Sequence, residues 1–213
     1  FVATEQNHVV AIDARTGEIF WDKTLAVPAL AVQHLCAKIP VLGVTGTPIL
    51  DPATRTLYLD AADGRADGSF GLRHLVFALS IDDGAARAGW PVDVEQKIAG
   101  FAATDQNQRG ALALLNGVLY LPYGSHSSGC GNYAGWVVGI DTTDPTKVSA
   151  FRVPAAGSGI WAPNGVASDG VSLYVATGNS YNAPVWGGSD SLLRLQPGPT
   201  FSFQSKDYFS PSN

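Results

Sequence analysis

Residues that could do chemistry are scattered along this sequence, and few have the spacing of a known site. Ser125 and His126 are adjacent, but no Gly-x-Ser-x-Gly elbow surrounds them, which argues against a hydrolase triad. His126 and Cys130 together supply only two candidate metal ligands, whereas a structural zinc site needs four. Gly157–Ala162 fits the dinucleotide fingerprint Gly-x-Gly-x-x-Ala, yet it opens no helix and belongs to no βαβ unit, so we treat the match as chance.

Two other groups of side chains also suggest a site at first sight. Asp60, Asp63 and Asp67 resemble a calcium-binding loop, but their spacing departs from the EF-hand pattern and its terminal glutamate is missing, so we expect a solvated turn. The aromatic residues of the long loops would either line a pocket of carbohydrate or quinone size or fix the loops in place. These aromatic residues are Tyr133, Tyr181 and Trp186.

The two cysteines, Cys36 and Cys130, lie far apart without a Cys-x-x-Cys spacing, which argues against a zinc or thioredoxin-type site. A disulfide in a secreted protein and two free buried thiols are the alternatives. The Ser-Ser-Gly-Cys-Gly-Asn surroundings of Cys130 indicate a surface position, so we favour a Cys36–Cys130 disulfide and an extracellular or periplasmic location.

The composition of the 213-residue chain is that of an ordinary globular protein with many turns. Gly (24) and Pro (13) are plentiful, which suits an all-β fold because these residues supply the backbone angles of turns. The net charge of −5 argues against a nucleic-acid partner, because phosphate binding needs a basic face. We find no 18-residue apolar span and no signal peptide, and we expect a trimmed chain or the ordered part of a longer one.

An internal repeat organises these residues. A Leu-Tyr strand recurs at Leu57–Leu59, Leu119–Leu121 and Leu173–Val175, with Phe1 in the tyrosine position of the first copy. Each of the three later copies follows an inner apolar segment and a tight turn, and the turns contain signals such as Asn-Gly and Asp-Gly. The inner segments are Gly46–Leu50, Gly110–Leu114 and Ala162–Val166. This pattern predicts antiparallel hairpins that repeat along the chain.

Each hairpin continues into a third strand and an outer strand that carries a large ring. The third strands are His8–Asp13, Leu75–Ser80, Gly135–Asp141 and Ser191–Leu195, and the outer rings are Trp21, Trp90 and Phe151. Long irregular segments separate the copies at Val27–Leu42, Asp63–Arg73, Glu95–Arg109, Gly124–Ala134 and Gly178–Asp190. A ring that recurs at one strand position is first a packing residue between neighbouring sheets.

These copies predict a β-propeller of four-stranded antiparallel blades. We expect one partial propeller domain over residues 1–213, with blades at about 1–25 (partial), 41–95, 108–153 and 160–213. A propeller needs roughly four to eight blades to close. The chain would therefore supply about half of a larger, eight-bladed wheel, and further sequence the rest.

The segment Ala11–Glu18 with Trp21 resembles the Ala-Leu-Asp-Ala-x-Thr-Gly-x-x-x-Trp repeat of the pyrroloquinoline quinone (PQQ) propellers. This family includes the quinoprotein alcohol dehydrogenases and a non-catalytic lipoprotein of the outer-membrane barrel-assembly machinery. The repeat covers most of the chain and is specific for the fold, but catalytic and scaffolding members both carry it.

A second match implies a cofactor site. In the alcohol dehydrogenases a tryptophan forms the floor under the quinone, and a Gly-x-Gly-Asn turn eighteen residues later gives an amide oxygen to Ca²⁺. Trp161 and Asn179 have this separation, so the resemblance implies that Trp161 stacks on PQQ and Asn179 binds calcium, which polarises the quinone carbonyl for hydride attack. Two structural roles stay open for the same residues: Trp161 as a strand residue packed between sheets, and Asn179 in a left-handed turn.

Two departures from the family pattern affect this site. The family's second calcium ligand is a glutamate, but the matching segment Gly124–Tyr133 has no carboxylate. The family's vicinal cysteine pair is also missing, and its catalytic base, an aspartate in the following blade, would lie beyond Asn213.

Two functions therefore remain in view. The first is a secreted or periplasmic quinoprotein dehydrogenase that oxidises alcohols or sugars with PQQ and calcium. The second is a non-enzymatic propeller scaffold that binds a protein or a glycan through its loop face.

Overall fold

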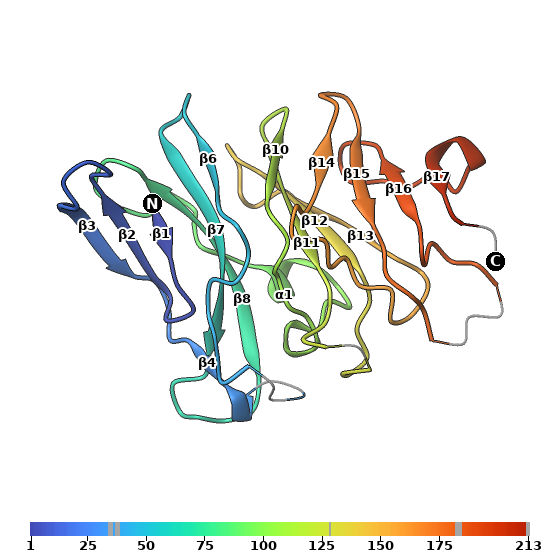
Figure 1. Ribbon diagram of the computed structural model, residues 1–213, viewed down its shortest axis with the longest axis horizontal. Coiled ribbons are helices and arrows are strands. Elements are labelled where there is room, and N and C mark those ends of the chain that lie inside the picture. Colours follow the sequence, from blue (N-terminus) through green and yellow to red (C-terminus); the bar gives the residue numbers. More distant parts are fainter. Residues whose placement is uncertain (34–35, 37–38, 128, 182–184, 212–213) are drawn as a thin grey trace. The chain divides into compact units, whose positions relative to one another are not determined.

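The computed structural model describes residues 1–33, 36, 39–127, 129–181 and 185–211. It is all-β, with 38% strand and 6% helix, which confirms the all-β part of the predicted fold class. The chain divides into two compact units, Phe1–Thr104 (unit 1) and Asp105–Asn213 (unit 2), which are described separately below (Figure 1).

Unit 1 contains two large antiparallel sheets whose strands are hydrogen-bonded in chain order. The first sheet is three-stranded, with β1 (Val2–Ala3), β2 (His8–Ile12) and β3 (Ile19–Thr24), and the second is four-stranded, with β6 (Ile49–Asp51), β7 (Thr56–Gly64), β8 (Leu72–Ser80) and β9 (Val92–Asp93). A two-stranded sheet of β4 (Ala29–Leu30) and β5 (Val41–Leu42) lies between them in the sequence. The short helices of unit 1 are η1 (Ala31–Gln33) and α1 (Val94–Lys97). A third short helix, η2 (Ala103–Asp105), lies at the division between the units.

A shared apolar core joins the two large sheets of unit 1. Val9, Ala11 and Trp21 of the first sheet pack with Leu57 and Phe77 of the second. In β2 the buried Val9 and Ala11 alternate with half-buried and exposed residues, as the two-residue period of a strand requires. Burial of these side chains is what holds the three-stranded sheet in place, because a small sheet has little stability by itself.

Unit 2 contains two four-stranded antiparallel sheets, again hydrogen-bonded in chain order. The first consists of β10 (Ala113–Leu115), β11 (Val118–Tyr123), β12 (Trp136–Asp141) and β13 (Val148–Arg152). The second consists of β14 (Ala167–Ser168), β15 (Leu173–Ala176), β16 (Leu192–Leu195) and β17 (Tyr208–Phe209), with the short helix η3 (Ser205–Asp207) before its last strand.

The core of unit 2 also lies between its two sheets. Tyr120, Val137 and Phe151 of the first sheet pack in one cluster with Leu173 and Leu193 of the second. Tyr120 is fully buried, and its hydroxyl accepts a hydrogen bond from the backbone N–H of Gly198 at 3.2 Å. Each unit is thus a pair of antiparallel sheets that pack face to face.

The predicted hairpins are present. Asn116 and Gly117 join β10 to β11 with φ angles of 51° and 75°, the positive values for which this pair of residues is suited. Asp169 lies in the turn between β14 and β15, and its carboxylate accepts the backbone N–H groups of Val171 and Ser172. The turn chemistry of these positions was therefore readable from the sequence.

Three boundaries differ from the prediction. The expected loop Asp63–Arg73 is shorter than predicted, because β7 and β8 pair as far as Gly64 and Leu72 and leave only residues 65–71 outside the strands. The segment Ala162–Val166 was expected to form an inner strand. The inner strand is instead β14, which begins at Ala167, directly after this segment. Trp90 also lies just before the outer strand, in which Val92 and Asp93 pair with β8.

The expected solvated turn at the three aspartates is wrong for two of them. Asp60 and Asp63 are buried within β7, and only Asp67 lies in a turn, where it accepts the N–H of Ser69. The Asp60 carboxylate meets Nδ1 of His74 at 2.7 Å, with side-chain exposures of 2% and 1%. A strand can bury carboxylates when partners satisfy them, and His74 comes from β8, the partner strand.

The four large sheets lie within the residue ranges 1–25, 41–95, 108–153 and 160–213. Their closure into a propeller wheel stays a prediction, since each unit is defined only by itself. Within the described part of the chain, no helix has the length and apolarity needed to cross a membrane.

Candidate functional site

Trp161 lies outside the strands of unit 2, in a slot formed by glycine backbone. A methyl group on Gly178 would lie 2.1 Å from Nε1 of the indole, and one on Gly159 would lie 2.9 Å from its Cε2 atom. At Gly124 the corresponding distance to Cε3 is 3.2 Å. Only glycine lets the backbone come this close to the ring, so three separate segments hold a half-buried indole without covering it completely. Trp161 is therefore not the strand residue of the packing alternative.

Asn179 follows directly on the glycine that contacts this indole. The backbone N–H of Gly178 donates to the carbonyl of Gly159 at 2.9 Å, which ties together two walls of the slot. The Asn179 side chain is exposed, and the residue is absent from the non-glycine residues with positive φ, so the left-handed alternative is wrong. The two residues singled out by the resemblance thus belong to one loop cluster of unit 2.

Two tyrosines complete the surroundings of Trp161. The buried Tyr133 ring meets the indole edge-on with a centroid distance of 5.5 Å, and the Tyr181 hydroxyl donates to the Tyr133 hydroxyl at 3.0 Å. Burial, and then the hydrogen bond with Tyr181, raises the pKa of Tyr133 to about 12. Tyr133 is accordingly a neutral phenol at physiological pH and fixes Tyr181, which is 39% exposed, beside the slot.

The segment Gln106–Gln108 supports the slot through Gly124, and reading the sequence missed this role. Asn107 and Gly124 exchange backbone hydrogen bonds of 2.7 and 3.0 Å, which fix the glycine that contacts the indole. All three side chains of the segment are buried, and Nε2 of Gln108 donates to the carbonyl of Gly110. A run of three amide residues inside a predicted loop was the available signal, because buried amides need fixed partners.

Trp186, the remaining loop aromatic, has a structural role. Its Nε1 donates to the Ser189 carbonyl at 3.0 Å, and its ring lies 4.1 Å from that of Tyr208. The ring also packs against the core of unit 2. The loop aromatic residues were expected either to line a pocket or to fix their loops in place, and Trp186 has the second of these roles.

The residues beside Asn179 do not fit a calcium ion. Asn179 offers one amide oxygen, and the segment Gly124–Tyr133 offers hydroxyl, imidazole and amide groups but no carboxylate. Asp190, whose backbone N–H donates to the Gly178 carbonyl at 3.0 Å, adds a single acidic residue to this neighbourhood. Within the described ranges no three His, Cys, Asp or Glu side chains gather as a metal-binding group. Calcium sites in proteins use six to eight oxygen ligands, usually with several carboxylates. The indole of Trp161 does offer a planar surface on which a ring could stack.

Cys36 and Cys130 form a disulfide, as expected from the sequence. The reason given for it was wrong in one respect, because Cys130 is fully buried and does not have the surface position that its Gly- and Ser-rich surroundings indicated. The buried Tyr133 lies only three residues further along the same segment. The segment therefore packs inward although its composition is that of an exposed loop.

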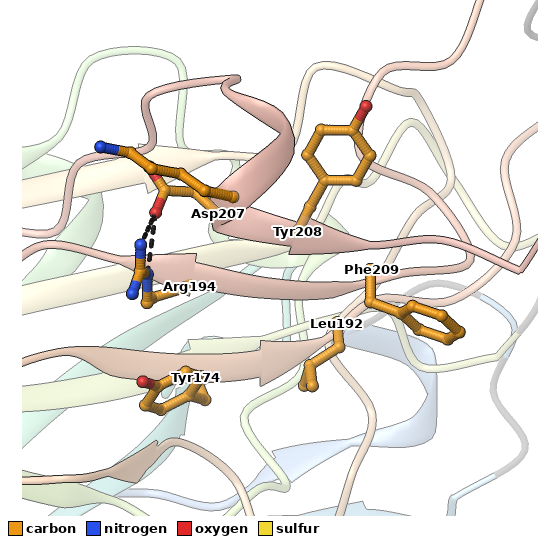
Figure 2. A pocket seen from close by; sticks show the side chains of 7 residues that line it. Tyr174, Leu192, Arg194, Asp207, Tyr208 and Phe209 are labelled. Carbon is orange, nitrogen blue, oxygen red and sulfur yellow. Dashed lines mark hydrogen bonds and ion pairs between the residues drawn. The ribbon is translucent and has the colours of Figure 1, made fainter.

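A second candidate is an open cavity of about 230 Å³ on the last sheet of unit 2 (Figure 2). Tyr174, Leu192, Arg194 and Phe209 line it together with Lys206, Asp207 and Tyr208. The Asp207 carboxylate accepts hydrogen bonds from Arg194 and Ser202, which lower its pKa, the Ser202 hydrogen bond having the larger effect. The charges of Arg194 and Asp207 satisfy each other, so this pair is first a structural feature of the sheet.

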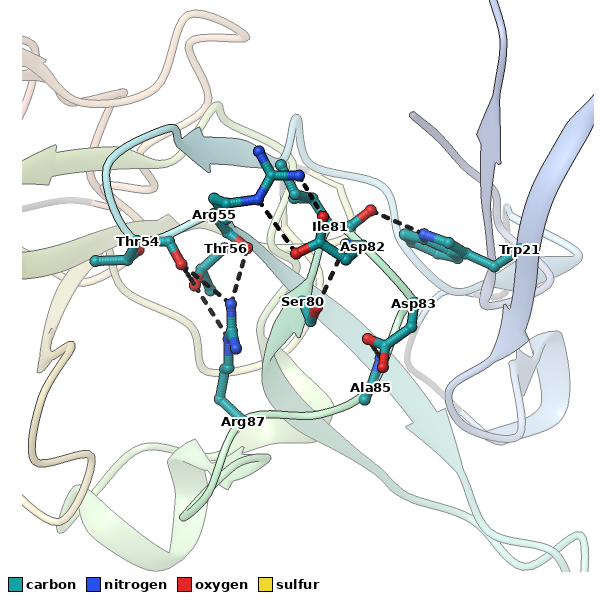
Figure 3. A network of polar contacts seen from close by, with 10 residues as sticks. All are labelled: Trp21, Thr54, Arg55, Thr56, Ser80, Ile81, Asp82, Asp83, Ala85 and Arg87. Atoms are coloured by element: carbon teal, nitrogen blue, oxygen red, sulfur yellow. Dashed lines mark hydrogen bonds and ion pairs between the residues drawn. The ribbon is translucent and has the colours of Figure 1, made fainter.

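A polar network in unit 1 holds the turn regions of its second sheet together (Figure 3). The Arg87 guanidinium donates to the carbonyls of Thr54 and Arg55, and Arg55 forms an ion pair with Asp82. Nε1 of Trp21 donates to the carbonyl of Ile81 at 3.0 Å in the same region. These groups are paired within the network, so we regard it as structural.

No family model matches this sequence, and no curated protein is significantly similar to it.

Proposed function

We propose that this chain is a binding module of the PQQ-like propeller type, and that its Trp161 slot binds a glycan. The observation that supports this most directly is the half-buried indole held between Gly124, Gly159 and Gly178. Sugars stack their C–H faces on such planar rings, and amide and hydroxyl groups around the ring fix their orientation. The exposed Asn179 directly follows Gly178 of the slot and supplies an amide, and the Tyr181 ring is fixed beside the slot by its hydrogen bond to Tyr133.

The disulfide supports a secreted or periplasmic location for this module. Disulfides persist in oxidising compartments and are rare in the cytosol. Extracellular and periplasmic proteins also meet glycans of cell walls and cell surfaces, which agrees with the proposed ligand class.

The quinoprotein dehydrogenase is the second candidate, and the position of Asn179 next to the Trp161 slot favours it. If PQQ binds, Trp161 would form its floor and the cofactor would accept a hydride from an alcohol or a sugar. The missing carboxylate ligands weigh against calcium, so we rank this function below glycan binding.

A glycan array with the full disulfide-bonded chain tests the proposal. We expect Trp161→Ala to abolish binding to the glycans that the unaltered chain retains, because the stacking surface is lost. Phe70→Ala is the matched control, since Phe70 is an exposed aromatic ring of unit 1 that lies away from the slot in sequence. Equal retention by Trp161→Ala and the unaltered chain would exclude the slot as the binding site.

A titration with PQQ and Ca²⁺ separates the two candidates. Saturable calcium-dependent PQQ binding that Asn179→Ala removes, together with dye-linked oxidation of alcohols or sugars, would establish the dehydrogenase in place of the binding module.

A further inference from the structure

Two aromatic rings of unit 2 pack against the same short backbone segment. A methyl group on Gly157 would lie 2.5, 2.6 and 3.0 Å from Cε2, Cδ2 and Cζ of Tyr181, which places this glycine over the face of the phenol ring. Two residues further on, a methyl group on Gly159 would lie 2.9 Å from both Cε2 and Cζ2 of Trp161. Only glycine lets the backbone approach a ring this closely. The segment Gly157–Gly159 is therefore a common wall behind both rings.

The buried Tyr133 lies against both of these rings. Because its centroid is 5.5 Å from that of Trp161 and 5.9 Å from that of Tyr181, the two outer centroids are at most about 11 Å apart. Both contacts of Tyr133 are of the edge-to-face type, which is a favourable arrangement for aromatic pairs. Tyr133 itself is only 1% exposed, so it connects the two accessible rings from the inside.

Tyr181 is fixed at several points although it is exposed. Its backbone N–H donates to the carbonyl of Ala156 at 3.1 Å. Its hydroxyl donates to the Tyr133 hydroxyl at 3.0 Å and accepts a hydrogen bond from the backbone N–H of Gly129. A ring that is already ordered in the free protein loses little further side-chain freedom when a ligand stacks on it. Tyr181 thus has the properties of a second stacking surface beside Trp161.

The spacing of the two rings decides what kind of sugar could use both. A single pyranose unit places one face on one aromatic ring, so it covers either the indole or the phenol. The two glycines behind the rings are two residues apart, a distance of no more than about 7 Å along the backbone. Neighbouring units of a sugar chain can therefore reach both rings at once, and a single unit cannot.

We propose that Tyr181 forms a second sugar-binding subsite, so that unit 2 binds an oligosaccharide whose units stack on Trp161 and on Tyr181. This inference rests on the proposed binding of a glycan at the Trp161 slot and names the form of that glycan, which is a chain bound along its length. When one unit lies on the indole, the next units are held close to the phenol ring, so the second contact raises the affinity of the same ligand.

Four homologous series serve as probes: cello-, xylo-, manno- and chito-oligosaccharides, each from the monosaccharide to the tetrasaccharide. NMR titration of the full disulfide-bonded chain measures the dissociation constant of every member. In a series that binds, we expect the affinity to rise about tenfold or more from the monosaccharide to the trisaccharide, because a second ring is then stacked. Trp161→Ala should remove the binding of the whole series.

Variants of Tyr181 identify the ring that causes this rise. Tyr181→Ala should bring the ratio of trisaccharide to monosaccharide affinity close to one, whereas Tyr181→Phe keeps an aromatic face on Gly157 and should keep most of the ratio. A general loosening of the loop would instead lower both affinities and leave their ratio unchanged.

A substitution behind the ring tests the same subsite without altering Tyr181. Gly157→Ala places a methyl group against the phenol ring and should lower the ratio. Gly170→Ala is the matched control, because Gly170 has a φ angle of 91°, close to the 80° of Gly157, but nothing lies within 4 Å of the added methyl group. Circular dichroism verifies the folds, and if Gly157→Ala does not fold, the Tyr181 variants decide alone.

The failure of this inference differs from the failure of the proposed function. Equal affinities for the monosaccharide and the trisaccharide, with binding that Trp161→Ala removes, would overturn the second subsite and leave glycan binding in place. An unchanged ratio in Tyr181→Ala would also overturn it. Absence of Trp161-dependent binding in all four series would overturn the glycan function together with this inference.

Discussion

Each unit has a tryptophan with a distinct environment, and the contrast shows how one side-chain type acquires two roles. In unit 1, Trp21 is 7% exposed, its N–H donates to the carbonyl of Ile81, and its ring lies over Gly84 (Figure 3). In unit 2, Trp161 is only half-buried, and three glycines hold its ring in an open loop cluster. A covered ring with a satisfied N–H stabilises the core, whereas a held but accessible ring can bind a ligand.

The position of Trp21 is taken in unit 2 by a different ring. Phe151 of β13 packs with Phe201, which follows the turn after β16, at a centroid distance of 5.7 Å. Trp21 of β3 contacts the turn after β8 in the corresponding way. The two units thus use the same outer-strand position to join neighbouring sheets, and Trp161 has no equivalent among these packing rings.

The largest expected effect is a difference in the free energy of unfolding between alanine variants of the two tryptophans. Trp21→Ala should lower the free energy of unfolding by about 3–5 kcal/mol, because a buried ring leaves a cavity between the two sheets. Trp161→Ala should cost clearly less, since its ring is partly exposed already. Urea denaturation followed by circular dichroism measures both, and a larger loss for Trp161→Ala would contradict the assignment of roles.

The next effect concerns paired carboxylates, whose burial differs between the units. Replacing Asp60 by leucine should destabilise unit 1 by about 3 kcal/mol, because it leaves His74 buried without its carboxylate partner. Arg194 and Asp207 form the comparable pair of unit 2, but the Arg194 side chain is 34% exposed. Arg194→Met should therefore shift the urea midpoint less than Asp60→Leu, and the reverse order would show that burial does not govern these pairs.

A smaller effect isolates the hydrogen bond of Trp21. Trp21→Phe keeps a ring between the sheets of unit 1 and removes the indole N–H, so we expect a loss of about 1 kcal/mol. Thermal unfolding of this variant beside Trp21→Ala measures the difference. If both variants lost the same stability, the hydrogen bond to Ile81 and not the ring would account for the whole effect of Trp21.

The smallest effect is the pH dependence that Asp169 of unit 2 contributes to stability. Hydrogen bonds from the N–H groups of Ser172 and Val171, and from the hydroxyl of Tyr174, lower the pKa of Asp169 to about 2. A carboxyl group with a pKa below the unfolded value of 3.8 stabilises the fold above that pH and loses its contribution as the pH falls toward 2. The unfolding midpoint of Asp169→Asn should therefore depend less on pH between about 4 and 2 than that of the unaltered chain. Parallel pH profiles of the two proteins would refute this role of Asp169.

Local sequence patterns predicted the strands and turns of both units well. The hairpin at Asn116-Gly117 and the turn at Asp169 follow from residues that accept positive φ or hydrogen-bond their own backbone. Such signals act over a few residues and need no tertiary partner. The end of the β7–β8 pairing was missed because the buried Asp63 carboxylate depends on tertiary partners, namely Arg73 of the neighbouring strand and the backbone N–H of Val27.

The surroundings of Trp161 depended on contacts that are distant in the sequence. Gly124, Gly159 and Gly178 come from three separate segments, and only the folded unit brings them to one ring. A single glycine in a loop usually indicates a turn, so its use as a wall for an aromatic ring is invisible in the sequence. The resemblance identified Trp161 and Asn179, but it gave no indication that Tyr133 and Tyr181 lie beside them.

A reciprocal experiment on the two tryptophans tests the central claim most directly. A glycan identified on the array is titrated by calorimetry into the unaltered chain, Trp21→Phe and Trp161→Phe, and the urea midpoint of each protein is recorded. We expect Trp21→Phe to lose stability and keep its affinity, and Trp161→Phe to keep its stability and lose affinity because a smaller ring stacks less well. Unchanged affinity in Trp161→Phe and Trp161→Ala would contradict the account.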